Sequence, residues 1–142
     1  MTADTNLNRF LAAQDGDYTR ALSEIKRGKK QSHWMWYIFP QIAGLGFSET
    51  ARFYAIKDLT EASAYLQHLI LGPRLIEIST ALLQIEGKTA NQILGSPDDL
   101  KLRSSMTLFN LVANAGPVFQ AVLTKYFDGT PDQKTLSLVK RD

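Results

Sequence analysis

The chain has 142 residues, a length typical of one domain that can bury its own core. Hydrophobic residues make up 44% of it and charged residues 21%, which argues against long disordered segments. There is no cysteine, so disulfides, a thiol nucleophile and iron–sulfur clusters are excluded. The net charge of +2 is too small to imply nucleic-acid binding. We therefore expect one soluble domain over residues 1–142.

The N-terminal residues and the hydropathy of the chain predict its location in the cell. Residues 1–6 carry neither a basic start nor an apolar run, so they do not resemble a signal peptide. Residues 1–5 are predicted to form a disordered tail. No stretch approaches the roughly 20 apolar residues that a membrane-spanning helix needs. We expect a cytoplasmic protein without membrane or nucleic-acid partners, and the basic cluster at 26–30 is interpreted as a solvated turn. The oligomeric state is left open.

Apolar residues recur with the helical period almost throughout the chain. One stripe begins at Tyr18 and repeats at the i+3, i+4 and i+7 positions through Ile25, and Gly28 offers a left-handed stop after it. No strand pattern is convincing. The spacing predicts an all-α fold, a single multi-helical orthogonal bundle of about seven to eight helices. The principal helices are expected at 18–25, 58–66, 72–85, 96–111 and 117–127, with shorter ones at 90–94 and after 130.

Capping residues mark the starts of several of these helices. Asp58 is followed three residues later by Glu61, which is the spacing of a capping box. Ser48 is expected to cap a further helix. Pro73 falls in a predicted first turn, where its missing N–H is not needed.

Both tryptophans lie in one aromatic segment, residues 32–41. Within it, the run 34–39 is interpreted as a short buried helix, with an extended core segment as the alternative. Trp34 and Trp36 are two residues apart, so they cannot share one side of a helix, and we expect neither to be fully internal. Either both rings only anchor the core, or one borders a pocket and stacks on a ligand.

Two residues are candidates for catalysis. His33 lies at the start of the aromatic segment and could exchange protons near neutral pH, although a capping role is the alternative. Glu61 is a second candidate for handling protons. The only other histidine, His68, is far away in the sequence, and no acidic cluster has the spacing of metal ligands, so neither a metal nor a cofactor is predicted.

Ligand-binding candidates are polar residues within otherwise apolar blocks. Gly44 and Gly46, ahead of the helix capped by Ser48, could expose backbone N–H groups to an anion, with simple turn formation as the alternative. Arg74 and Glu77 suit an ion pair or a ligand contact. Lysine and serine residues share one side of the helix at 96–111 at i, i+3 and i+4. The candidate set is Lys29, Trp34, Trp36, Gln41, Ser48, Arg74, Lys101, Ser104 and Ser105.

Several blocks of the sequence also resemble a known bacterial family, domain-of-unknown-function family eighteen-ten. The blocks are SHWMWYIFPQ at 32–41, GLGFS at 44–48, YAI at 54–56, LGPRL at 71–75 and SSMTLF at 104–109, and the match spans residues 6–139. The resemblance implies a compact, all-helical cytoplasmic protein. Members are sometimes labelled "calpastatin", but that inhibitor is disordered and rich in proline and lysine, whereas this chain is periodic.

Two hypotheses about function follow. The first is that the domain binds, and in its stronger form hydrolyses, a small polar metabolite such as a nucleotide or an ADP-ribose derivative. The order of the blocks is similar to that of domains that act on ADP-ribose derivatives, and this similarity implies the ligand class. The alternative is a non-enzymatic protein-interaction module with a structural aromatic core. Whether the protein is an enzyme is left open.

Overall fold

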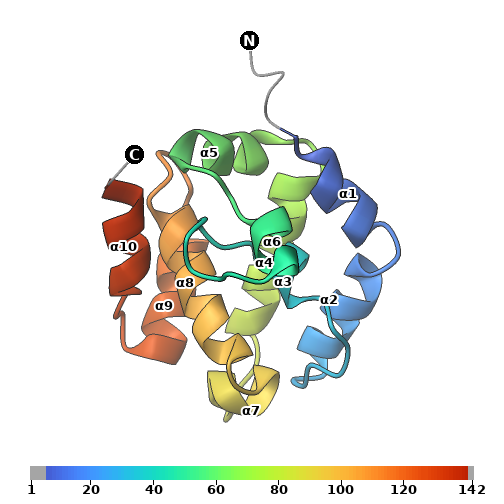
Figure 1. Ribbon diagram of the computed structural model, residues 1–142. Helices are drawn as coiled ribbons and strands as arrows, with labels where there is room; N and C mark the ends of the chain where they lie inside the picture. The colour runs from blue at the N-terminus through green and yellow to red at the C-terminus, as the bar shows by residue number, and fades with distance from the viewer. Residues whose placement is uncertain (1–5, 141–142) are drawn as a thin grey trace.

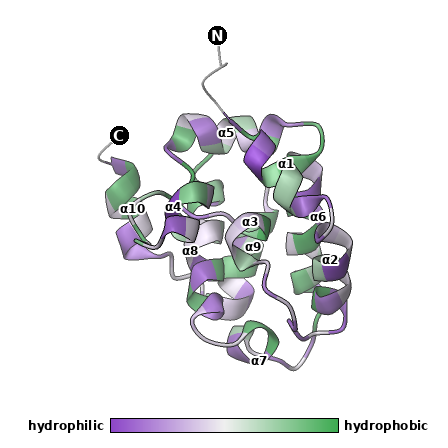
Figure 2. Cartoon of the chain, turned by 45° about the vertical axis from the view of Figure 1, so that its right-hand side comes forward, coloured by the Kyte–Doolittle hydropathy of each residue, from purple (hydrophilic) through white to green (hydrophobic). Residues whose placement is uncertain are grey.

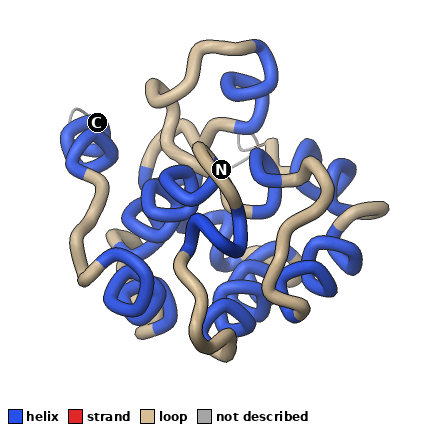
Figure 3. The backbone as a smooth tube through the Cα atoms, turned by 90° about the horizontal axis from the view of Figure 1, so that it is seen from below, coloured by secondary structure: helices blue, strands red, loops and turns tan. Residues whose placement is uncertain are grey.

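The computed structural model describes residues 6–140, so the predicted tail at 1–5 lies outside the described residues. Within this range the chain forms ten helices joined by loops, with no strand (Figure 3). The all-α prediction is confirmed. The predicted number of seven to eight helices is wrong: the seven predicted by range correspond to α2 and α5–α10, and α1, α3 and α4, of four to seven residues, bring the described residues to ten, although short helices at 34–39 and after Ser48 were expected one by one. The orthogonal arrangement stays a prediction.

Helices from all parts of the chain pack around a common core (Figure 1). The two longest have 13 residues each, and no helix in residues 6–140 is long and apolar enough to cross a bilayer. Their bounds are α1 Asn8–Gln14, α2 Tyr18–Lys26, α3 Met35–Ile38, α4 Glu49–Tyr54, α5 Leu59–Gln67, α6 Leu71–Leu83, α7 Ala90–Leu94, α8 Asp98–Asn110, α9 Val118–Phe127 and α10 Gln133–Lys140.

Helices α6 and α8 organise the core. Helix α8 packs against α5, α7, α9 and α10, and α6 packs against α2, α5 and α9. Residues 104–109 of α8 are buried without interruption, which is possible because neighbours surround that part of the helix. Other helices are amphipathic, and Figure 2 shows hydrophilic and hydrophobic residues on the same helix, as in α2.

The predicted capping residues occupy their expected places. The side chain of Ser48 accepts a hydrogen bond of 3.1 Å from the Ala51 N–H, and that of Asp58 accepts one of 2.9 Å from the Glu61 N–H. Gly28 follows α2 with a φ of 80°, in the left-handed region that favours glycine. These local features were predicted because each depends on residues close together in the sequence.

The aromatic segment forms α3 and then a loop that crosses the front of the molecule in Figure 1. The short-helix interpretation of 34–39 is therefore confirmed. The following loop is tied to the chain after α4, because Ile56 donates its N–H to the Gln41 carbonyl at 2.8 Å and accepts from the Ala43 N–H at 2.8 Å. The two segments thus hold each other in place beside α3.

Candidate functional site

Trp34 belongs to the core. Its side chain is only 1% exposed, and its Nε1 donates a hydrogen bond of 2.9 Å to the carboxylate of Glu24. The expectation that neither tryptophan is fully internal is wrong for this residue, because Glu24 satisfies the one polar atom of the ring. Burial raises the pKa of the Glu24 carboxyl, but hydrogen bonds from Ser32, the Gln31 backbone and Trp34 outweigh it and lower the pKa to about 2.

Trp36 is only partly buried and borders an open hollow of about 320 Å³, which we call the outer hollow. Its walls come from α3, the loop at 41–46, the start of α8 and the start of α10. The aromatic segment and the helix at 96–111 therefore face one hollow. The lining residues are Trp36, Gln41, Leu45, Gly46, Pro97, Leu100, Lys101, Ser104, Asp132 and Lys134.

A lysine lies against the ring of Trp36 within the outer hollow. The Nζ of Lys101 is 3.9 Å from the centre of the ring, within the range of a cation–π interaction. The same Nζ is 3.3 Å from one carboxylate oxygen of Asp98, and the other oxygen is 3.0 Å from the Nζ of Lys30. Two lysines thus share one carboxylate, so the Lys101 ammonium is held in place without being fully neutralised.

Within the same lining, a serine and an aspartate lie together. The Oγ of Ser104 donates a hydrogen bond of 2.9 Å to Asp132, whose backbone N–H donates to Thr107 at 2.9 Å. The Asp132 carboxylate also accepts a 3.2 Å hydrogen bond from the Thr135 N–H in α10. Asp132 is absent from the sequence-predicted set. It was seen only as part of a helix start, because 28 residues separate it from Ser104.

A smaller cavity of about 100 Å³, which we call the inner cavity, lies next to the outer hollow. The two share Trp36, Gln41 and other lining residues of the 41–46 loop. The Nε2 of Gln41 is buried and has no hydrogen-bond partner within residues 6–140. The complete lining of the inner cavity is Trp36, residues 41–46, Ala51, Arg52, Tyr54 and Ala55.

Of the predicted binding residues, four line the outer hollow: Trp36, Gln41, Lys101 and Ser104. The adjacent Ser105 is completely buried, and its Oγ has no partner among the described residues. The hydroxyls of Ser104 and Ser105 therefore face different surroundings. Consecutive residues point in different directions from a helix, and α8 packs against four other helices.

The remaining predicted residues lie outside both cavities. Lys29 and His33 are exposed and line neither, and Ser48 serves as a helix cap. The Arg74 side chain contacts Gln14 at 3.3 Å and stacks over Tyr18 at 5.0 Å. The hydroxyl of that tyrosine donates to the Glu77 carboxylate, so the predicted pair at 74 and 77 is bridged by an aromatic ring.

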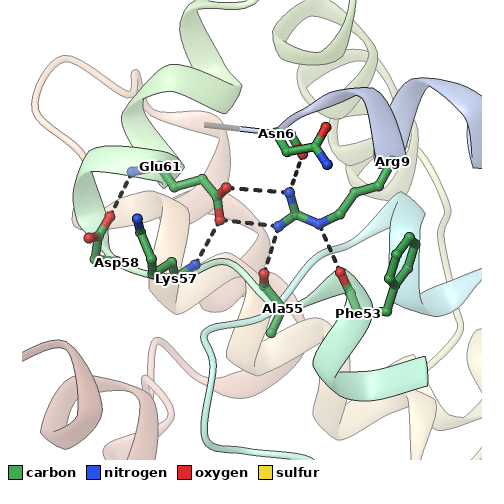
Figure 4. Close-up of polar contacts among 7 residues, drawn as sticks. All are labelled: Asn6, Arg9, Phe53, Ala55, Lys57, Asp58 and Glu61. Atoms are coloured by element: carbon green, nitrogen blue, oxygen red, sulfur yellow. Dashed lines mark hydrogen bonds and ion pairs between the residues drawn. The ribbon is translucent and has the colours of Figure 1, made fainter. Parts of the chain in front are cut away.

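Glu61 forms a buried ion pair (Figure 4). Its carboxylate is 3.1 Å from the guanidinium of Arg9 and accepts a 2.8 Å hydrogen bond from the Lys57 N–H. The same guanidinium donates to the carbonyls of Phe53 and Ala55, each at 2.8 Å. The two side chains join α1, the end of α4 and the start of α5, and this gives Glu61 a structural role.

The site offers binding chemistry from several residue types. Together the two cavities contain an aromatic ring, cations, a hydroxyl, a carboxylate and an unpartnered amide. Within residues 6–140, no group of three or more histidine, aspartate or glutamate residues lies close enough to hold a metal ion. A concave site with a few convergent polar groups is the usual arrangement for a small-molecule site.

Comparisons with known proteins identify the family. A family model described as "Protein of unknown function (DUF1810)" matches residues 4–139. The crystal structure of the conserved hypothetical protein Rv1873 from Mycobacterium tuberculosis is similar to this chain. The two are 46% identical, the match covers 96% of this chain and 98% of that one, and the TM-score is 0.95. No curated protein matches significantly. These matches give no support to the calpastatin label. Since the match extends over nearly all of its length, the chain belongs to the DUF1810 family of proteins of unknown function.

Proposed function

We propose that the outer hollow binds a small polar metabolite with an anionic group, such as a nucleotide or an ADP-ribose derivative. The observation that carries this proposal is the position of Lys101, whose Nζ lies 3.9 Å from the Trp36 ring centre at the edge of the hollow. An aromatic surface and an ammonium side by side suit a ligand that combines a flat or apolar part with a negative charge.

Other residues of the lining complement such a ligand. The Asp132 carboxylate and the Ser104 hydroxyl can exchange hydrogen bonds with the hydroxyl groups of a sugar. Lys134 adds a second cation at the rim, in a position to meet a phosphate. The volume of about 320 Å³ is at the lower end of the range for ligand sites, which favours a compact ligand.

The ion pair at the hollow also permits binding. Asp98 is shared between Lys101 and Lys30, so its one negative charge does not balance both ammonium groups. An anionic ligand can therefore meet the Lys101 ammonium without displacing Asp98. Binding is proposed here without hydrolysis, because His33 lies outside the hollow and Glu61 is engaged by Arg9.

Isothermal titration calorimetry with AMP, ADP-ribose and ribose 5-phosphate tests the proposal. We expect at least one of them to bind, and the substitution Lys101→Met to weaken binding about tenfold, which corresponds to about 1.4 kcal/mol. Lys26→Met is a matched control, since Lys26 is exposed and remote from the hollow lining. Equal losses in both variants, or no binding of any of the three compounds, would contradict the proposal.

The alternative function, a non-enzymatic interaction module, is favoured by a different observation. Phe47 and Phe53 are 69% and 57% exposed, although large aromatic side chains are usually buried. A partner could cover these rings. This alternative gains support if none of the three compounds binds and if replacing both phenylalanines with serine changes the sedimentation of the purified protein.

A cytoplasmic location is a further part of the proposal. It is supported by the absence of cysteine and by the nature of the proposed ligands, which are common metabolites inside cells. Fractionation of cells that express the full chain would test the location.

A further inference from the structure

We infer that the inner cavity is a subsite for a compact oxyanion, a carboxylate or a phosphate group, of the ligand in the outer hollow. The inference rests on the proposed function and adds to it the place and the chemistry of one ligand group. The two spaces share Trp36, Gln41, Leu45 and Gly46, so one molecule can extend from the outer hollow into the inner cavity.

The size of the inner cavity suits one small group. The volume of about 100 Å³ is roughly a third of that of the outer hollow, at about 320 Å³, so it suits one small group of a ligand. A carboxylate or a phosphate group is of this order of size. A nucleobase together with a sugar would have to remain in the outer hollow.

Several polar groups in the lining of the inner cavity have no hydrogen-bond partner within the described residues. The Gln41 Nε2 is buried and unpartnered, and such groups are rare in native proteins. The backbone N–H groups of Gly44 and Gly46 also donate no hydrogen bond within the described part of the chain. An oxyanion can accept from several such donors at once.

The two glycines allow the loop to lie close to its neighbours. A Cβ at Gly46 would come within 2.7 Å of the Ala51 Cβ, and one at Gly44 within 3.0 Å of the Leu138 side chain. Gly44 also has a φ of 103°, which other residues rarely adopt. A side chain at either position would displace the loop, so the glycines keep its backbone at the cavity wall.

The charge of the lining favours an anion over a neutral group. Arg52 is the one charged residue among those that line the inner cavity, and its side chain has no ion pair within residues 6–140. A neutral carbonyl could satisfy Gln41 but would leave this guanidinium without a counterion. A carboxylate or a phosphate can satisfy both, because arginine presents paired donors to such groups.

The wall that carries Arg52 is held in place from behind. The Arg9 guanidinium donates hydrogen bonds to the carbonyls of Phe53 and Ala55, and Ala55 itself lines the cavity (Figure 4). The Glu61 carboxylate fixes that guanidinium. The backbone that follows Arg52 is therefore braced, which lowers the cost of ordering this wall when an anion binds.

Nuclear magnetic resonance of the ¹⁵N-labelled full chain tests the inference with three probes: sodium acetate, sodium phosphate and sodium chloride at equal ionic strength. We expect the side-chain amide of Gln41 and the backbone amides of Gly44 and Gly46 to shift saturably with acetate or with phosphate, and not with chloride. A response to acetate alone assigns a carboxylate, and a response to phosphate alone assigns a phosphate group. Absence of a saturable shift with both oxyanions would overturn the inference.

Variants then separate this subsite from the outer hollow. Gln41→Met keeps the side-chain length but removes the amide, and Arg52→Gln removes the charge at an exposed position whose side chain makes no hydrogen bond or ion pair within the described residues. Both should abolish the shifts of Gly44 and Gly46, whereas Gln67→Met, at an exposed glutamine, should not. If ADP-ribose still shifts the indole N–H of Trp36 while neither oxyanion reaches Gly46, the subsite is wrong and the proposed function stands. If the oxyanions bind but no metabolite shifts Trp36, the proposed function fails and the anion site stands.

Discussion

The indole Nε1 of Trp34 donates a hydrogen bond of 2.9 Å to the carboxylate of Glu24, and both residues are buried. The same carboxylate accepts hydrogen bonds from the N–H groups of Gln31 at 2.8 Å and Ser32 at 3.0 Å. One acidic side chain of α2 therefore holds the loop that leads into the aromatic segment. Because that loop precedes Trp36, Glu24 also determines where the ring beside the outer hollow can lie.

The first prediction concerns Glu24 and pH. Replacing it with glutamine leaves buried donors without an ionised acceptor, so we expect Glu24→Gln to lower the free energy of unfolding by about 2–3 kcal/mol at pH 7. The carboxyl pKa is about 2 in the folded protein against an ordinary 4.5. Its stabilisation is therefore fully present above 4.5 and is lost as the pH falls towards 2. Urea unfolding of both proteins at pH 7 and pH 3 checks this. A gap between them that is as large at pH 3 as at pH 7 would contradict it.

The second prediction distinguishes the two tryptophans. Trp34 is 1% exposed, whereas Trp36 borders open space. In the Trp36→Phe variant, only the buried indole remains, and we expect acrylamide to quench its fluorescence several-fold less than that of the Trp34→Phe variant. The Trp34→Phe protein must first be shown to fold by circular dichroism. Equal quenching constants for the two variants would show that the second ring is not at a surface hollow.

The third prediction assigns Glu61 to folding. Its side chain is 7% exposed and that of Arg9 is 11% exposed. Loss of one partner leaves a buried charge uncompensated, so we expect Glu61→Gln to reduce the free energy of unfolding by about 2–4 kcal/mol. The exposed Glu86 provides a control, since Glu86→Gln should change stability by less than about 0.5 kcal/mol. Equal thermal unfolding temperatures for Glu61→Gln and Glu86→Gln would contradict a structural role for Glu61.

The fourth prediction concerns the attachment of α10. The Asp132 carboxylate accepts from Ser104 in α8 and from the Thr135 N–H in α10. We expect Asp132→Ala to cost about 1–2 kcal/mol, as loss of a helix cap does, and to increase hydrogen exchange in residues 133–140. Ser104→Ala should have a smaller effect, because the bond to Thr135 remains. Unchanged exchange in α10 would show that other contacts hold the helix.

The sequence by itself determined the helical fold and its local details. The 3.6-residue period placed most helices, and the caps at Ser48 and Asp58 were found because donor and acceptor lie three residues apart. The predicted number of helices was too low, because it did not include α1, whose seven residues give little periodicity, or the short helices expected at 34–39 and after Ser48. Part of the lining of the candidate site was also predicted, because Trp36, Gln41 and Lys101 belong to unusual polar and aromatic blocks.

Only the tertiary structure decided which of these residues meet. Trp34 can be completely buried because the chain folds back and brings the Glu24 carboxylate to its indole nitrogen. The spacing of residues within one helix does not predict that contact. Asp132 reaches Ser104 across 28 residues, and Arg9 reaches Glu61 across 52. These pairings depend on how helices pack, and packing is set by the shape of the whole core. The aromatic segment therefore indicated where a candidate site lies, and the fold decided that Trp36 lines the outer hollow.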